Sequence, residues 1–248
     1  MKEAEEQFIK YTNSYKKYGE RILLKIQHTF RVERLCEELA NSLELSQEEI
    51  DLAKLCGLLH DIGRFEQWKN YKTYDDLKSL DHGTLGETIL KENNFIDQFT
   101  NNNHDTILRA VKYHNKYKVP NTLSKKNKMY VNITRDADKI DILQLTVNGP
   151  LAISTDNTKM TESVYKTLFN KKSINVKDVK TKADAIAIRI AFLFDLNCKK
   201  SFEIIKEKNY MNILIENQLK ETNNKELINQ LKELKIFINQ YIEEMISC

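Results

Sequence analysis

Glycine and proline are scarce in this chain, and that scarcity constrains its fold more than any other feature. Only 6 glycines and 2 prolines occur among 248 residues. Sheets joined by tight hairpins depend on both residues to shape their turns, so a chain this poor in them favours helices. Apolar residues make up 41% of the sequence, which is enough for a substantial core. We therefore predict an all-α fold.

Apolar residues recur at intervals of three and four along most of the chain, as expected of helices that bury one face. Gly149 and Pro150 interrupt any helix that reaches them, and the segment 125–128 is predicted to be a loop. The helices predicted from periodicity cover residues 18–41, 127–146, 165–169, 183–197, 199–219 and 225–246.

Two further helices are marked by signals at their ends. Ser46 and Glu49 have the spacing of a capping box, which begins a helix. This helix is predicted to run through His60, with Gly63 as its stop. Asp105 is placed to cap a second helix. Both helices carry histidines close to their ends.

Charge and cysteine usage indicate which partners and compartment to expect. The net charge is +3, and lysine and glutamate are mixed along most segments. A nucleic-acid binder usually gathers positive charge on one face, so we expect no stable nucleic-acid partner. The cysteines include no Cys-x-x-Cys pair and are interpreted as reduced thiols of a cytosolic protein. They are Cys36, Cys56, Cys198 and Cys248.

No segment reads as a signal peptide or as a membrane span. Residues 1–10 are charged and lack the apolar core of a signal peptide. The most apolar later stretch, residues 185–196, is interrupted by Arg189 and Asp195 and is too short to cross a bilayer. We therefore expect a cytoplasmic protein with no membrane partner.

Histidine is rare, and four of the five histidines lie at or near apolar helical segments. His28 shares a helix face with Val32, and Asp138 shares one with Ile142. A single inward histidine is more often a hydrogen-bonded core residue, but a buried carboxylate is costly unless it is paired or bound to a metal. Histidines and carboxylates that point inward from separate helices indicate a divalent metal site. The histidines are His28, His60, His82, His104 and His114.

The order of these residues resembles the HD-domain superfamily of metal-dependent phosphohydrolases. Its core pattern is a histidine, then a His-Asp pair, then an aspartate; the branch with extra histidines adds two more. The matching residues are His28, His60-Asp61 within 58–64, His82 within 81–86, His114 within 111–117, and Asp138 within 137–141. The resemblance spans about residues 20–150. It implies a single HD-type helical bundle over 1–248, with a core of about 18–150 and a C-terminal helical extension of about 151–248.

The resemblance also implies the ligands of one or two divalent metal ions. Mn, Fe, Co, Ni, Zn and Mg are the candidates, and a mixed set of imidazoles and carboxylates suits the first five better than Mg. Asp61 would bridge to a second ion, although His82 reaching a substrate phosphate instead is left open. The implied ligands are His28, His60, Asp61 and Asp138 for the first ion, with His82 and His114 for the second.

Three other polar residues near these motifs are given minor roles. The Ala-Asp pair of the resemblance favours Asp138 over Asp136 as the last ligand. Asp136 and Asp141 are interpreted as surface carboxylates or as supports for the ligands. His104 matches no element of the resemblance and is predicted to be a surface histidine.

The substrate's negative charge requires positively charged partners near the ligands. Arg64 follows the His-Asp pair and is the first choice, since arginine contacts phosphate through two donors. Lys116 and Lys112 flank His114 and are further candidates. Asp61 is predicted to act on the attacking water as well as to bind metal. Trp68 and Tyr71 are candidates for stacking on a base, with packing as the more common use of such aromatics.

The predicted function is hydrolysis of a phosphoester of a nucleotide or related small molecule by metal-activated water. Phosphomonoesterase, phosphodiesterase and pyrophosphohydrolase activities are all compatible with the motif. Two alternatives belong to other classes: a sensor that binds metal and nucleotide without turnover, and a di-iron oxygenase on the same frame. The C-terminal helices carry no recognisable catalytic group and are candidates for a cover over the site or for a homo-oligomer contact.

Overall fold

The computed structural model describes residues 1–93, 95–97, 99, 102–154 and 156–247, and among them it contains helices and no strand. The all-α prediction is confirmed. The chain divides into two compact units, residues 1–138 and 139–248. The boundary falls inside one long helix, α7 (Lys125–Asn148). The expected single domain, with a core of 18–150 and an extension of 151–248, stays a prediction.

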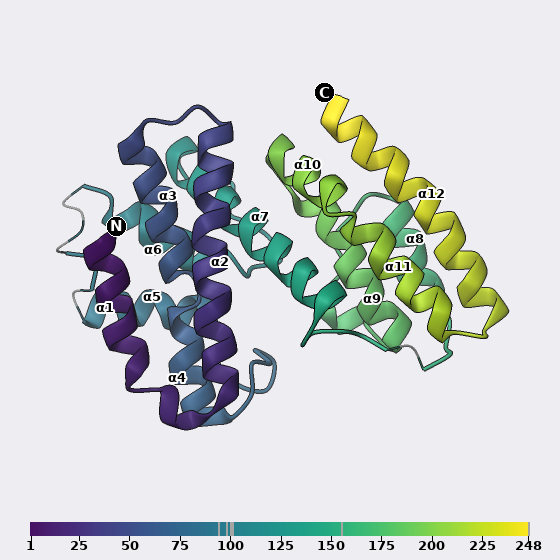
Figure 1. Ribbon diagram of the computed structural model, residues 1–248, viewed down its shortest axis with the longest axis horizontal. Helices are drawn as coiled ribbons and strands as arrows, with labels where there is room; N and C mark the ends of the chain where they lie inside the picture. The colour runs from purple at the N-terminus through teal and green to yellow at the C-terminus, as the bar shows by residue number, and fades with distance from the viewer. Residues whose placement is uncertain (94, 98, 100–101, 155, 248) are drawn as a thin grey trace. The chain divides into compact units, whose positions relative to one another are not determined.

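The first unit is a bundle built around two neighbouring helices, the long α2 and the shorter α3 (Figure 1). Gly57 allows their close approach, because a Cβ at that position would lie 2.7 Å from the Cys36 sulfur and 3.1 Å from the Glu33 Cα. Its helices are α1 (Lys2–Asn13), η1 (Lys16–Tyr18), α2 (Glu20–Ser42), α3 (Gln47–Leu59), α4 (Ile62–Tyr71), α5 (His82–Glu92), α6 (His104–Tyr113) and the first part of α7.

The predicted capping box at Ser46 and Glu49 is confirmed, but the predicted stop at Gly63 is wrong. Helix α3 ends at Leu59, and α4 begins at Ile62, so Gly63 is the second residue of a new helix. Gly63 therefore does not end a helix but allows two helices to pack closely. A Cβ there would lie 2.3 Å from the carbonyl oxygen of His82 and 2.8 Å from the Gly86 nitrogen, so glycine is what lets α4 and α5 touch.

Two other helix starts differ from the prediction. The predicted loop at 125–128 is wrong, because α7 already begins at Lys125. Ser124 provides the overlooked signal: its hydroxyl accepts a hydrogen bond from the Asn127 backbone N–H at 3.1 Å, as a helix cap does. The helix expected after Asp105 exists as α6, but Asp105 lies within its first turn and Asn103 occupies the cap position.

The second unit is a separate bundle of shorter helices and one long amphipathic helix, α12. Leu231, Leu234 and Ile238 form the buried face of α12. The predicted helix over 199–219 is interrupted at Asn209, which adopts a left-handed conformation with φ of 55° that asparagine tolerates better than most residues. The helices are α8 (Glu162–Phe169), η2 (Val176–Asp178), α9 (Lys182–Ala191), η3 (Phe192–Asp195), α10 (Lys199–Glu207), α11 (Tyr210–Glu221) and α12 (Lys225–Ser247).

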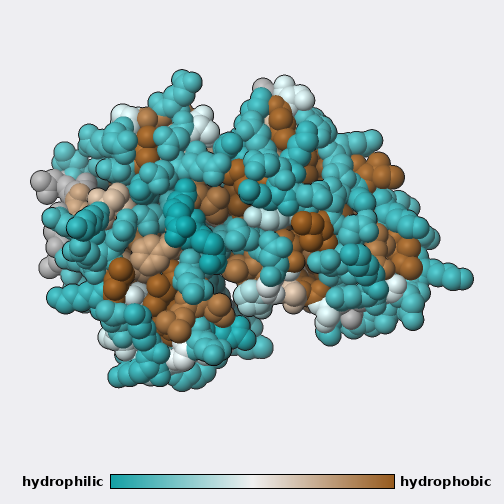
Figure 2. Space-filling view, in the orientation of Figure 1, coloured by the Kyte–Doolittle hydropathy of each residue, from teal (hydrophilic) through white to brown (hydrophobic). Residues whose placement is uncertain are grey.

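Hydrophilic residues cover most of the face visible in Figure 2, with hydrophobic residues scattered between them. Among the described residues, none of the helices has both the length and the apolar character of a membrane span. Cys36, Cys56 and Cys198 are buried thiols, whereas Cys248 lies outside the described residues. Asp136 and Asp141 are fully buried, which excludes the surface alternative for both, whereas their role as supports for the ligands stays a prediction.

Candidate metal centre

All six predicted ligands come together in the first unit, although they are spread over more than a hundred residues of sequence. They arrive from α2, the junction of α3 and α4, the start of α5, the end of α6, and α7. Five are almost fully buried, and the Asp138 side chain is 16% exposed. The six are His28, His60, Asp61, His82, His114 and Asp138. A buried cluster of this composition fits a metal site better than a packed core.

The first ligand group consists of His28, His60, Asp138 and one oxygen of Asp61. His28 Nε2 lies 3.3 Å from His60 Nε2 and 3.2 Å from Asp138 Oδ1. Asp61 Oδ2 lies 3.5 Å from the Nε2 atoms of both histidines. Two atoms that each bind one ion at about 2.1 Å are about 3.0–3.4 Å apart. The donor atoms are therefore spaced to hold one divalent ion.

The second ligand group consists of His82, His114 and the other oxygen of Asp61. The Nε2 atoms of the two histidines are 3.0 Å apart. Asp61 Oδ1 lies 3.4 Å from His82 Nε2 and 3.6 Å from His114 Nε2. The two oxygens of one carboxylate thus face two different pairs of histidines. This arrangement fits a shared carboxylate between two metal positions.

Backbone carbonyls fix the tautomers of two ligand histidines. The His60 Nδ1–H donates to the Gly57 carbonyl at 2.7 Å, and the His114 Nδ1–H donates to the Val111 carbonyl at the same distance. Each bond joins a histidine to the residue three positions earlier, at the end of its helix. With Nδ1 protonated, the Nε2 lone pair of each ring faces the cluster and is free to bind a metal.

Asp76, which the sequence reasoning missed, orients His82. It lies between α4 and α5, and its Oδ2 accepts a hydrogen bond from His82 Nδ1 at 2.7 Å. Its Oδ1 accepts from Gln67 at 2.8 Å and from Arg64 at 3.0 Å. A carboxylate behind a histidine ligand is a common support of metal sites. The residue precedes the motif by only six positions, but a loop offers no periodicity to reveal it.

Arg135 is a second support that the sequence reasoning missed. It lies on α7 one turn before Asp138 and is almost completely buried. One guanidinium nitrogen donates to the carbonyls of Tyr113, His114 and Lys116, at 2.7–2.9 Å. This contact fixes the end of α6 against α7, so it sets His114 relative to Asp138. Arg135 precedes Asp138 by three residues on the same helix, and this spacing is the sequence signal that could have identified it as a support.

The electrostatics of the cluster keep the carboxylates ionised and the second histidine pair neutral. Burial alone would raise the pKa of Asp61, but the Lys25 ammonium and the neighbouring histidines outweigh it and hold the pKa well below its usual range. Burial lowers the pKa of His82 to about 3, with the Arg64 charge acting in the same direction. Burial also lowers the pKa of His114. Ionised carboxylates and neutral imidazoles are the forms that bind metal.

Of the three predicted substrate-binding residues, only Arg64 lies at the cluster. Its Nε is 3.6 Å from Asp61 Oδ1. Lys112 instead forms an ion pair with Glu87 at 2.7 Å, and Lys116 forms one with Asp81. The charges of both lysines are therefore taken up by carboxylates of the α5 region.

The remaining candidates from the sequence lie outside the cluster. His104 is partly exposed and lies 3.6 Å from Asp97, as expected of a surface histidine. Tyr71 is 44% exposed. Trp68 instead packs against Tyr74, with ring centroids 4.9 Å apart, and donates its indole N–H to the Tyr18 carbonyl. Trp68 therefore has a packing role in this structure.

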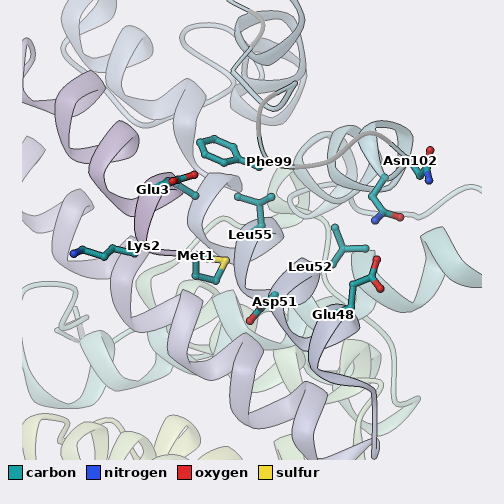
Figure 3. A pocket seen from close by; sticks show the side chains of 11 residues that line it. Met1, Lys2, Glu3, Glu48, Asp51, Leu52, Leu55, Phe99 and Asn102 are labelled. Carbon is teal, nitrogen blue, oxygen red and sulfur yellow. The ribbon is translucent and has the colours of Figure 1, made fainter.

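A pocket of about 780 Å³ lies elsewhere in the first unit, between the start of α1, α3 and the segment before α6 (Figure 3). Its lining includes the apolar residues Leu52, Leu55 and Phe99 and the carboxylates Glu48 and Asp51. None of the six predicted ligands lines it. The chemistry of the donor atoms, and not the size of a cavity, therefore identifies the candidate site.

Comparison with known families agrees with this geometry. Residues 26–143 match the family model of the HD domain, and this region contains all six predicted ligands. Within this matched region, the His and Asp groups are compatible with an HD-type divalent metal site. No curated protein and no solved structure matches the chain.

Proposed function

We propose that this protein is a dinuclear phosphohydrolase that cleaves a phosphoester of a nucleotide or related small molecule with water. The observation that carries the proposal is the position of Asp61. Its two oxygens lie 3.4–3.6 Å from histidine nitrogens of both ligand groups. A carboxylate shared in this way is the arrangement expected of a two-metal hydrolase site.

The first ligand group would hold one ion and the second ligand group the other, with Asp61 common to both. Divalent ions bound there supply Lewis-acid polarisation of the phosphoryl group and lower the pKa of a water molecule. The mixture of imidazole and carboxylate donors favours Mn, Fe, Co, Ni or Zn over Mg. His82 is accordingly proposed as a metal ligand and not as a contact to the substrate phosphate.

The reaction places different demands on Asp61 and Arg64. The water oxygen forms a bond to phosphorus, the bond from phosphorus to the leaving oxygen breaks, and the leaving oxygen takes a proton. Asp61 has a pKa well below its usual range, so its role is to orient the water by accepting a hydrogen bond while it remains ionised. Arg64 is beside Asp61 and neutralises charge on the phosphoryl oxygens.

The expected cytoplasmic location, the lack of a stable nucleic-acid partner and a possible homo-oligomer belong to this proposal as well. A small phosphorylated substrate fits a cluster that is enclosed by helix ends and buried side chains. The sensor alternative predicts a missing ligand, whereas all six donors converge here. Hydrolysis is therefore the reading that the cluster supports best.

The test is hydrolysis of a generic phosphomonoester and a generic phosphodiester by protein loaded with each candidate metal. The double variant His60→Ala/Asp61→Ala is the control, because it removes one ligand of the first group and the shared carboxylate. The proposal expects turnover of at least one ester class with one of the metals, and none in the double variant. Turnover that survives the double substitution would contradict the proposed site. Oxygen consumption with tightly bound iron, and no hydrolysis with any metal, would favour the oxygenase alternative.

A further inference from the structure

Lys25 is a positively charged residue in direct contact with the candidate metal centre. It lies on α2 one turn before His28, and its Nζ is 2.5 Å from Asp61 Oδ2. That oxygen is also the one that faces His28 and His60. The Lys25 side chain is 20% exposed, whereas that of Asp61 is 3% exposed. The ammonium therefore approaches the shared carboxylate from the more open side of the site.

Arg64 approaches the same carboxylate from its other oxygen. One of its terminal nitrogens is held by Gln67, by the carbonyl of Tyr74 and by Asp76, at 2.6–3.0 Å. Its Nε is buried and lies 3.6 Å from Asp61 Oδ1, but it has no hydrogen-bond partner among the described residues. An unsatisfied buried donor of a charged group is costly, and a ligand oxygen at the site would satisfy it. The guanidinium is thus anchored at one end with a donor left for a ligand.

The Tyr74 ring lies close to both cations. The Lys25 Nζ and the Arg64 Cζ each lie 5.6 Å from the centre of the Tyr74 ring. The ring is fixed because the Tyr74 hydroxyl donates to the Arg21 carbonyl at 3.0 Å and because Trp68 packs against it. Lys25 and Arg64 therefore converge on one place from two different helices, with the Tyr74 ring beside both.

Bound metal would give the site an excess of positive charge, which favours an anionic ligand. Among the described residues, the charged side chains that form ion pairs with Asp61 or with the ligand histidines include two cations, Lys25 and Arg64, and three carboxylates, Asp61, Asp76 and Asp138. Histidines that bind metal are neutral. One or two divalent ions would therefore leave an excess of positive charge in a largely buried site, where uncompensated charge is expensive. The more negative the phosphoryl group, the better it offsets this excess.

We propose that Lys25 and Arg64 form a recognition pair for a terminal phosphoryl group, so that the site selects phosphomonoesters over phosphodiesters. This inference rests on the proposed phosphoester hydrolysis and narrows its substrate class. A terminal phosphoryl group carries roughly −1.5 to −2 charges at neutral pH, whereas a diester has lost one ionisable oxygen to its second ester bond. Lys25 leaves Asp61 for the incoming group, and the carboxylate is then balanced by the metal ions.

The experiment measures binding of methyl phosphate and of dimethyl phosphate to the metal-loaded protein by calorimetry. Both probes are small and differ mainly in charge. The variants are Lys25→Met and Lys25→Gln, which remove the ammonium with different polarity in case one of them folds poorly. Arg34→Met is the matched control, since Arg34 is an exposed cation on the same helix. Metal content is measured on every sample.

The expected result is that the unsubstituted protein binds methyl phosphate at least about 10-fold more tightly than dimethyl phosphate. Loss of Lys25 should weaken the binding of methyl phosphate about 10- to 100-fold, as loss of a charge-assisted hydrogen bond does. The affinity for dimethyl phosphate should change by less than about 3-fold. Arg34→Met should change neither. Metal content should stay the same in all variants.

Three results would overturn the inference: unchanged affinity for methyl phosphate, an equal loss for both probes, or loss of metal in the Lys25 variants. The last would mean that Lys25 only balances the charge of Asp61. These outcomes are separable from failure of the proposed hydrolysis. Protein that binds methyl phosphate as expected but hydrolyses no ester would contradict the proposed function and leave the recognition pair intact.

Discussion

The two ligand groups share Asp61 but are built differently. The first ligand group has three further donors, His28, His60 and Asp138, and two of these lie within the long helices α2 and α7. The second ligand group has only His82 and His114, at the two ends of the short helices α5 and α6.

The supports of the two groups differ as well. Backbone carbonyls fix His60 of the first group and His114 of the second, whereas His82 of the second group depends on the side chain of Asp76, from a loop. Side-chain networks are lost by a single substitution more easily than helix backbones are. The first metal position should therefore be the tighter and more robust of the two.

The shared residue should give the largest effect. Asp61→Ala removes the donor common to both groups and leaves Lys25 without its carboxylate. We expect loss of the second ion, much weaker binding of the first, and a fall in kcat/KM of at least about 10³-fold, the equivalent of several kcal/mol of lost electrostatic stabilisation. Metal content by mass spectrometry and a hydrolysis assay measure both effects.

Asp51→Ala is the control for this variant, because Asp51 is a partly exposed carboxylate on α3. It should keep both metals and full turnover. An Asp61→Ala protein that retained two ions per chain would show that the two groups do not depend on a shared carboxylate.

Asp76→Asn should separate the two groups. Asparagine keeps the size of the side chain, but its neutral amide oxygen is a weaker acceptor for the His82 Nδ1–H than the Asp76 carboxylate is. We expect the affinity for the second ion to fall about 10- to 100-fold, with the first unchanged, since loss of a supporting carboxylate typically has this effect. Titration with Mn or Zn, followed by calorimetry, resolves the two steps.

Asp75→Asn is the neighbouring control, because Asp75 faces the exposed Lys78 at 3.5 Å and not the cluster. Equal weakening of both binding steps in Asp76→Asn would mean that the loop supports the whole site. In that case the difference between the groups would not hold.

Gly63→Ala tests whether the contact of α4 with α5 maintains the second ligand group. The added methyl group would collide with backbone atoms of His82 and Gly86, which cannot rotate away. We expect about 3 kcal/mol of lost stability in urea unfolding, together with weaker binding of the second ion. Gly149→Ala is the control, since the Leu145 carbonyl oxygen would be 4.0 Å from the new Cβ, an ordinary van der Waals distance. An unchanged second ion in a destabilised Gly63→Ala protein would uncouple this contact from the site.

The smallest effect concerns the helix pair α2 and α3 that supports the first ligand group. Burial, with the nearby Glu5 carboxyl, raises the pKa of Glu33 to about 7 from 4.5. Between these two pH values the folded chain holds a proton that the unfolded chain has lost, so this residue's contribution to stability falls as pH rises from about 4.5 to about 7.

Glu33→Gln removes that dependence. The difference in unfolding free energy between the variant and the unsubstituted protein should change by on the order of 1–2 kcal/mol between about pH 5 and about pH 8, in favour of the variant at the higher pH. Urea unfolding at the two pH values measures it. A difference that stays constant would show that Glu33 titrates near its ordinary pKa in the folded protein.

Much of the fold could be predicted from the sequence, because it depends on local patterns. The family resemblance selected six residues that lie together in the structure, and their role as metal ligands stays a prediction. The capping box at Ser46 and the inward face of His28 follow from helical spacing, and both occur as predicted. The role of Gly63 does not follow from the sequence, because glycine both ends helices and permits close packing, and only the position of α5 decides between the two.

The supports of the site could not be predicted in the same way. Asp76 belongs to an irregular segment and meets His82 only through the path of that loop. Lys25 lies one turn from His28, but its contact with Asp61 depends on how α2 meets the α3–α4 junction. Lys112 and Lys116 show the converse: they flank a ligand in sequence, yet pair with Glu87 and Asp81.

The central claim is that Asp61 joins two metal positions, and the most direct test is anomalous diffraction from crystals of the protein loaded with manganese. The account predicts two anomalous peaks about 3.5–4 Å apart, one beside each oxygen of Asp61. One peak should lie among His28, His60 and Asp138, and the other beside His82 and His114. A single peak, or peaks away from Asp61, would contradict the claim.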